Sequence, residues 1–182
     1  MTLHPAGSTN SALGKGAAPV LAIEHLNIGI RQADRTARRV VNDFSLSMCA
    51  GEIVGLVGES GSGKTMVGRA VLQLLPPVAF TEGGLIEVDG KPLPKVGTRQ
   101  IRAMRGRDVG MVFQEPMVSL NPALTVGKQM IEALRLHHGL SARAARDRCL
   151  IMLERVRIAE PSNCFKAYPH QFSGGMRQRI ML

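Results

Sequence analysis

The sequence predicts an α/β fold with an antiparallel β lobe and a helical lobe. Three observations lead to this class. Two runs with alternating apolar residues lie within residues 21–48, a continuous apolar run at 52–57 leads into a glycine-rich loop, and helical periodicity dominates the second half of the chain. With 182 residues, of which 45% are hydrophobic, the chain can bury the core of one domain with an additional lobe.

The N-terminal part predicts a flexible tail followed by the β lobe. Residues 1–19 are rich in Gly, Ala, Ser and Pro and have no periodicity, which is typical of a flexible tail. The apolar patterns at 21–30 and 40–48 predict two strands joined by a basic connection. A third strand is expected at 85–88, because the pair Asp89-Gly90 behind it favours a hairpin turn.

A strand, a glycine loop and a helix are predicted next. The run 52–57 is short and apolar, as in a buried parallel strand. The helix should end before Pro76-Pro77, because proline cannot continue it. Its apolar residues recur at helical spacing: Met66, Val67, Ala70, Val71 and Leu74.

The loop between this strand and this helix predicts the ligand. It reads Gly58, Glu59, Ser60, Gly61, Ser62, Gly63, Lys64, Thr65. This order fits G-x-x-x-x-G-K-[ST], the P-loop whose inward-facing N–H groups bind the phosphates of a nucleoside triphosphate. Lys64 is expected to add a positive charge at the β- and γ-phosphates, and the Thr65 hydroxyl to complete a Mg²⁺ shell. The sequence therefore predicts a P-loop NTPase core.

The remaining elements are mostly helices. A short helix is expected at 99–107, followed by a buried strand at 109–113 that ends at Gln114. Helices are predicted at 125–137 and 141–156, the latter opening on a Ser cap. We interpret the apolar stripe of that last helix as core packing; its members are Ala142, Ala145, Cys149, Met152, Leu153 and Val156.

Composition narrows the class of partner. Lys and Arg outnumber Asp and Glu 23 to 14, but only five Phe and one Tyr could stack on bases, so nucleic acid is not expected as a partner. Cys49, Cys149 and Cys164 are far apart and have no metal-ligand spacing, which predicts reduced thiols in a cytosolic protein. No apolar run approaches the roughly 20 residues of a membrane span, so any membrane association is expected to go through a partner.

A second motif resembles the signature sequence of the ATP-binding cassette family. Residues 168–179 read Tyr-Pro-His-Gln-Phe-Ser-Gly-Gly-Met-Arg-Gln-Arg. The core Ser173, Gly174, Gly175 puts a hydroxyl and accessible N–H groups at a helix start, which suits a γ-phosphate. The P-loop, Gln114 and this motif follow one another in the family's order, and the resemblance covers about residues 21–182.

The resemblance implies ATP and Mg²⁺ as cofactors. It assigns Gln114 to the loop glutamine that reaches Mg²⁺ and the attacking water. It also implies a second ATPase subunit, because in this family the signature faces the nucleotide held by the opposite subunit. The domain expected at 20–182 then has a β lobe and P-loop core at 20–114, a helical lobe at 115–170, and the signature with the start of its helix at 171–182.

The sequence around Gln114 resembles that of one branch of the family. Gln114-Glu115-Pro116 is followed by Ser-Leu-Asn-Pro at 119–122 and Thr-Val-Gly at 125–127, which is similar to the oligopeptide, dipeptide and nickel import branch. This resemblance implies an ATP-binding subunit that couples ATP binding and hydrolysis to uptake of peptides or nickel. It would act through integral membrane permeases, indirectly with a substrate-binding protein, as a peripheral protein on the cytoplasmic face of the bacterial inner membrane.

One departure from the family concerns the base of the nucleotide. The family stacks an aromatic residue on adenine near the end of its first strand, whereas here Ile30 stands near that place and residues 20–43 contain no Phe, Tyr or Trp. A cation–π contact from an arginine is the alternative. The candidates are Arg31, Arg35, Arg38 and Arg39.

The second departure concerns hydrolysis. Residues 176–182 contain neither Asp nor Glu, and the family's Mg²⁺-supporting Asp, water-polarising Glu and switch His come later in its sequence. The expectation is a C-terminally incomplete cassette that binds ATP without turning it over. Two alternatives stay open: a non-hydrolysing nucleotide-binding or regulatory fragment, and a soluble cassette protein that acts on ribosomes or DNA.

Overall fold

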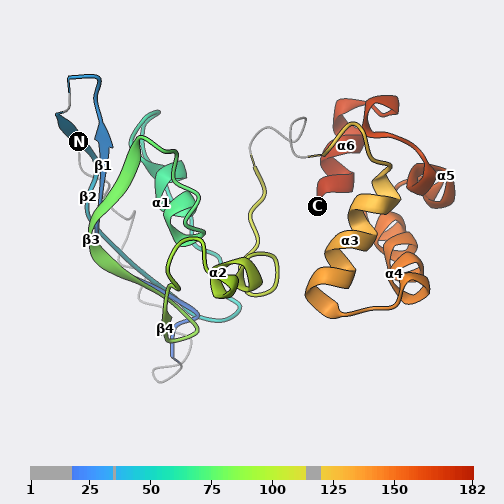
Figure 1. Cartoon of the computed structure of the whole chain (residues 1–182), viewed down its shortest axis with the longest axis horizontal. Coiled ribbons are helices and arrows are strands. Elements are labelled where there is room, and N and C mark those ends of the chain that lie inside the picture. The colour runs from blue at the N-terminus through green and yellow to red at the C-terminus, as the bar shows by residue number, and fades with distance from the viewer. Residues whose placement is uncertain (1–17, 35, 114–119) are drawn as a thin grey trace. The chain divides into compact units, whose positions relative to one another are not determined.

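The computed structural model describes residues 18–34, 36–113 and 120–182 (Figure 1). These residues form two compact units, the first ending at Asp108 and the second spanning Val109–Leu182. The first unit holds the antiparallel sheet and two helices, and the regular elements in the described part of the second are helices. The tail expected at 1–19 lies almost wholly outside the described residues.

The first unit is built on a four-stranded antiparallel sheet with the order β2-β1-β3-β4. These strands span Leu21–Arg31 (β1), Ala37–Met48 (β2), Ala79–Val88 (β3) and Lys91–Pro92 (β4). The three predicted strands are confirmed, and β3 begins earlier than the expected residue 85. The early part of β3 escaped prediction because it contains Gly83 and Gly84, and glycine weakens a strand pattern.

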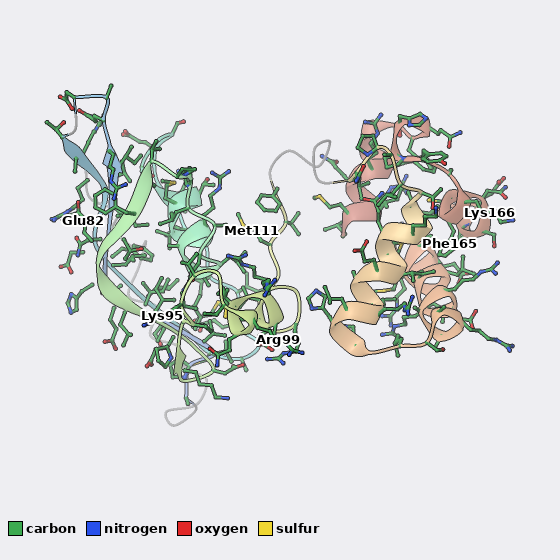
Figure 2. All side chains as sticks on the ribbon, viewed as in Figure 1. Glu82, Lys95, Arg99, Met111, Phe165 and Lys166 are labelled. Carbon is green, nitrogen blue, oxygen red and sulfur yellow. The ribbon has the colours of Figure 1, made fainter. Side chains whose placement is uncertain are left out.

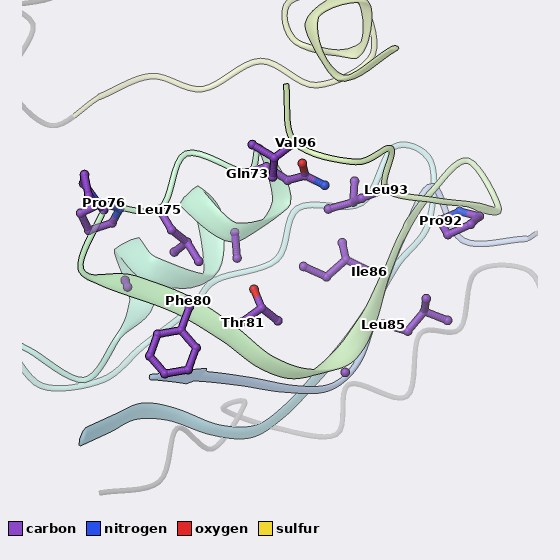
Figure 3. A pocket seen from close by; sticks show the side chains of 14 residues that line it. Gln73, Leu75, Pro76, Phe80, Thr81, Leu85, Ile86, Pro92, Leu93 and Val96 are labelled. Atoms are coloured by element: carbon purple, nitrogen blue, oxygen red, sulfur yellow. The ribbon is translucent and has the colours of Figure 1, made fainter. Parts of the chain in front are cut away.

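The two faces of this sheet carry different residues. One face is buried and includes the opposed pair Ile28 and Val41. Figure 3 shows Ile86 on the side of β3 that faces the first helix, and Phe80 on the other side. On that outer side, Arg39 Nε lies 2.6 Å from Glu82 Oε2. The sheet therefore covers a core with one face and carries polar and aromatic side chains on the other.

Two helices complete the first unit. Helix α1 spans Lys64–Val71 and buries Val67, Ala70 and Val71, which confirms the predicted helix and its end before the two prolines. Helix α2 spans Arg99–Met104, shorter than the predicted 99–107. Arg105, directly after α2, donates from Nε to Leu72 O and from its terminal nitrogen to Gln73 O, at 2.8 and 2.9 Å. This guanidinium satisfies carbonyls at the C-terminal end of α1.

The two predicted buried strands at 52–57 and 109–113 are wrong for this structure. Neither segment is part of a ladder in the described residues, apart from an isolated bridge at Val109. Ile53 is 97% exposed and Val112 60% exposed. The apolar pattern is real, but a strand satisfies its N–H and C=O groups through a neighbouring strand, and neither segment has one here.

The second unit confirms the predicted helices. It contains α3 (Val126–His138), α4 (Ala142–Arg155), α5 (Pro161–Lys166), the short 3₁₀ helix η2 (Pro169–Gln171) and α6 (Gly174–Met181). The α3 and α4 caps are Thr125, whose Oγ1 accepts from Lys128 N, and Ser141, whose Oγ accepts from Ala144 N. Both caps supply an acceptor that a helix start otherwise lacks.

A separate core holds these helices together. Its buried members are Val126, Leu153, Ile158, Cys164 and Ile180. The predicted stripe on α4 is buried at Ala145, Cys149 and Leu153. A β-carbon at Gly127 would lie 2.5 Å from Phe165 O, so α3 approaches the α5 region too closely for any other residue. No helix in the described ranges is both long and apolar enough to cross a membrane.

Candidate nucleotide-binding site

The predicted P-loop forms a tight turn that leads into α1. Gly61 and Gly63 have φ values of 81° and 95°, in the left-handed region that favours glycine. A β-carbon at Gly63 would lie 2.8 Å from both Val40 O and Val41 Cγ2. Position 63 therefore needs glycine for two reasons, its backbone conformation and the close approach of β2.

Lys64 folds back across this turn. Its Nζ donates to Gly58 O at 2.6 Å, to Glu59 O at 2.7 Å and to Ser62 Oγ at 3.3 Å. An ammonium group has three donors, and the loop supplies one acceptor for each. The loop is thus organised around a positive charge, and Ser62 is itself buried.

The start of α1 is suited to an anion. Its first turn contains no acidic residue, and no side chain among the described residues caps it. The first N–H groups of a helix lack intrahelical partners and carry the positive end of the helix dipole. A pocket of about 190 Å³ opens at this end, lined by Ile30, Val40 and the six residues from Gly61 to Met66. Backbone donors and Lys64 at one small pocket are the arrangement that binds phosphate.

The structure brings most of the predicted phosphate-site residues together. Gly61, Ser62, Gly63, Lys64 and Thr65 line the same pocket. Gly58 and Glu59 join it through the carbonyls that hold Lys64, and Ser60 lies exposed in the same turn.

A larger pocket of the first unit has different chemistry (Figure 3). It measures about 610 Å³, lies between β3, the end of α1 and residues 92–96, and has no charged residue in its lining. Gln73 contributes an amide whose Nε2 donates to Pro94 O, while its Oε1 has no partner among the described residues. Without positive charge or free helix N–H groups, this pocket does not fit a phosphate.

The signature motif begins a helix, as predicted. Ser173 is the N-cap of α6, and its Oγ accepts from Met176 N at 3.4 Å. Gly174 and Gly175 are exposed, and a β-carbon at either would meet nothing within 4 Å. Packing inside the described chain therefore gives no reason for these two glycines.

Gln114 lies outside the described residues, so its predicted role remains a prediction. The structure adds a residue that the sequence pattern did not indicate, Gln129 on α3. Its carboxamide accepts from Asn121 N at 2.8 Å and donates to Asn121 O and Leu124 O, both at 3.0 Å. Gln129 thus holds the turn that follows the Gln114 segment, through contacts that a helical periodicity cannot reveal.

Comparison with known proteins decides the family. The family model described as ABC transporter matches residues 41–182. The chain belongs to the ABC transporter family. Membership in the ABC transporter family implies nucleotide binding, in agreement with the P-loop pocket.

Individual relatives support the same assignment. The chain is 47% identical over 165 residues to the uncharacterized ABC transporter ATP-binding protein YejF of Escherichia coli, covering 90% of this chain and 31% of that protein. It is 42% identical to the dipeptide transport ATP-binding protein DppD of Bacillus subtilis, covering 90% and 49%. The chain thus spans between about a third and a half of these curated relatives.

Solved structures confirm the cassette fold. A dimeric structure of the ATP-binding cassette MJ0796, in a post-hydrolysis state bound to ADP and Pi, matches with a TM-score of 0.75. Its sequence identity is 22%, and the match covers 88% of this chain and 66% of that chain. The predicted fold class, a P-loop cassette with an antiparallel β lobe and a helical lobe, is confirmed.

Proposed function

We propose that this chain is the nucleotide-binding part of an ATP-binding subunit from an ABC importer of peptides. One observation carries the nucleotide assignment: Lys64 and the uncapped start of α1 meet at one pocket. The importer assignment is supported by relatives named for dipeptide transport, peptide import and glutathione import, at 41 to 42% identity.

Mg-ATP is the proposed ligand of the P-loop pocket. The glycine at position 63 leaves the loop free of side-chain bulk, and Lys64, whose ammonium group donates to three loop acceptors, would exchange one of them for a phosphate oxygen. Thr65 also lines the pocket, and its side chain carries a hydroxyl group, which in a P-loop completes a Mg²⁺ shell. With Gln114, by resemblance, Thr65 would hold the ion. Bound Mg²⁺ would neutralise phosphate charge.

A second cassette subunit is the proposed partner at the signature. Ser173 and the first N–H groups of α6 form a helix start without acidic residues. The exposed Gly174 and Gly175 would let the phosphates of a nucleotide held by the other subunit come close to the backbone. Both features support the composite site that the family resemblance implies.

Membrane permeases are the proposed partners of the helical part. We assign residues 20–114 to the β lobe and P-loop core, 115–170 to the helical lobe, and 171–182 to the signature and its helix. The segment around Gln114 would link nucleotide state to the permease. The subunit would then work on the cytoplasmic face of the bacterial inner membrane.

Nucleotide binding is tested by titrating the purified chain with a fluorescent ATP analogue and Mg²⁺. Lys64→Ala is expected to weaken binding about 10- to 100-fold, because hydrogen bonds from a charged group contribute about 1.5–3 kcal/mol. Lys91→Ala, which removes a lysine from β4, is the matched control and should bind like wild type. Equal affinities of wild type and Lys64→Ala would contradict the proposal.

The partner is tested by cross-linking in cells that carry the complete subunit. The native cysteines are replaced, and single cysteines are introduced by Met117→Cys or Ser119→Cys. Capture of an integral membrane permease is expected from these positions but not from Arg143→Cys, which lies exposed on α4. Capture of ribosomal proteins would favour a non-transport cassette.

A further inference from the structure

The P-loop pocket is too small for a whole nucleotide. Its volume is about 190 Å³, whereas pockets that enclose small ligands usually measure about 300–1,000 Å³. Backbone donors and Lys64 occupy the side formed by the loop and α1, so the phosphates belong there. The base must therefore lie outside the phosphate pocket, against whatever surface borders it.

The bordering surface comes from the sheet. Ile30 at the end of β1 and Val40 on β2 form the sheet side of the pocket. Both offer apolar contact, but neither offers a planar group that can stack on a base. A planar cation would complete such a surface, because guanidinium groups stack on aromatic faces.

Two nearby arginines are already engaged on the other face of the sheet. Arg31 Cζ lies 5.0 Å from the centroid of the Phe80 ring. Arg39 Nε lies 2.6 Å from Glu82 Oε2, and Figure 2 shows Glu82 on the side of the sheet away from α1. Gly29 agrees with placing Glu82 and Phe80 on one face, because a β-carbon built on Gly29 would contact both side chains. Arg31 and Arg39 therefore belong to the outer face.

Arg38 lies on the opposite face from these two. In the antiparallel register of β1 and β2, Arg38 is directly across from Ile30. Residues directly opposite each other in such a pair project on the same face of the sheet. Ile30 lines the P-loop pocket, so the side chain of Arg38 starts on the pocket's face. The side chain of Arg38 is exposed, and in the described part of the structure its guanidinium makes no ion pair or hydrogen bond.

We propose that Arg38 stacks its guanidinium on the base of the bound nucleotide, with Ile30 beside it. This inference rests on the proposed nucleotide site and adds the residue that binds the base. A cation–π contact at an exposed site corresponds to about a two- to fivefold change in affinity. Stacking uses the face of the base and not its edge, so it would favour a base over none without selecting among purines.

The test separates the base from the phosphates. Calorimetry measures the dissociation constants of Mg-ATP and of magnesium tripolyphosphate, which has the phosphate chain but no base, on the purified chain. Arg38→Ala should weaken Mg-ATP about two- to fivefold more than it weakens tripolyphosphate. Arg38→Lys keeps a charge that can still make a cation–π contact but loses the planar group, so it should show a selective loss smaller than that of Arg38→Ala. Arg31→Ala removes a charge from the outer face and should leave the ratio of the two constants at the wild-type value.

Each result has a definite meaning. An unchanged ratio in Arg38→Ala, or an equal loss for both ligands, would overturn the stacking role while leaving the phosphate site intact. A selective loss in Arg31→Ala as large as in Arg38→Ala would overturn the assignment to one face. If neither ligand bound the wild type, or Lys64→Ala had no effect, the nucleotide site itself would be wrong, and the inference would fall with it.

Discussion

At the residue scale, Gly63 and Gly68 lie close in sequence but have opposite structural requirements. Gly63 has φ 95° and no room for a β-carbon beside β2, whereas Gly68 lies inside α1 with nothing within 4 Å of an added β-carbon. Gly63→Ala should lower the free energy of unfolding by about 1–3 kcal/mol through backbone strain. Gly68→Ala should raise it by about 0.5–1 kcal/mol through helix propensity.

Urea unfolding of both variants, followed by circular dichroism, measures these changes. The two variants can be compared directly because each adds one methyl group, either at the end of the P-loop or inside the helix that follows it. A Gly63→Ala chain as stable as wild type would show that the loop does not need the conformation described.

The thiols differ in accessibility. Burial raises the pKa of Cys149 and Cys164 above the ordinary value of 9.0, while Cys49 is only half-buried. Because these folded-state pKa values exceed those of the unfolded chain, the contribution of both thiols to stability is present below about pH 9 and is lost as the pH rises further. A thiol reagent at pH 8 should therefore label Cys49 first.

The measurement counts modified thiols in native and in urea-unfolded protein. Cys49→Ser is the control, and its native form should react very slowly. Rapid modification of all three thiols in the native chain would contradict the packing of Cys149 in α4 and Cys164 in α5.

At the element scale, the cap of α4 offers a clean test. Ser141 Oγ accepts from Ala144 N at 3.2 Å, which satisfies a donor at the helix start. Ser141→Ala should cost about 1 kcal/mol of stability. Ser141→Asp keeps an acceptor and adds a favourable charge at the helix start, so it should retain wild-type stability. Unfolding in urea checks both, and equal stability of all three chains would mean that the cap has no effect.

The same elements show what the sequence could predict. Caps, helical stripes and turn pairs are local, so α1, α3, α4, the first three strands and the P-loop could be placed from the sequence. The runs 52–57 and 109–113 have a strand's composition, but pairing is a long-range property that no local pattern contains. The same holds for the site. Its glycines and Lys64 could be predicted from the local sequence. The position of Arg38 opposite Ile30 could not, because it depends on the register between β1 and β2, which irregularities shift.

At the scale of the whole molecule, apolar segments without a strand partner should limit its behaviour in solution. Ile53 and Val57 in the first unit are 97% and 68% exposed and lie four residues apart along an unpaired segment. Such segments favour association between chains. Replacing both, Ile53→Lys with Val57→Lys, should raise the concentration at which the chain stays monodisperse.

Light scattering at increasing concentration measures this effect. Leu136→Lys is the control, because Leu136 is 75% exposed but lies on a formed helix, and single exposed apolar residues are ordinary. If Leu136→Lys raised the monodisperse concentration by a similar amount, the improvement would come from the added charge alone.

The position of β1 between β2 and β3 has a consequence for local opening. Its backbone amides are bonded to strands on both sides, so they are released to solvent only when a large part of the first unit opens. The edge strand β2 can fray without disturbing β3. Amide hydrogen exchange should therefore be slowest in β1. Since β1 carries Ile30, this side of the nucleotide pocket would stay in place while the edge strand β2, which carries Arg38, moves.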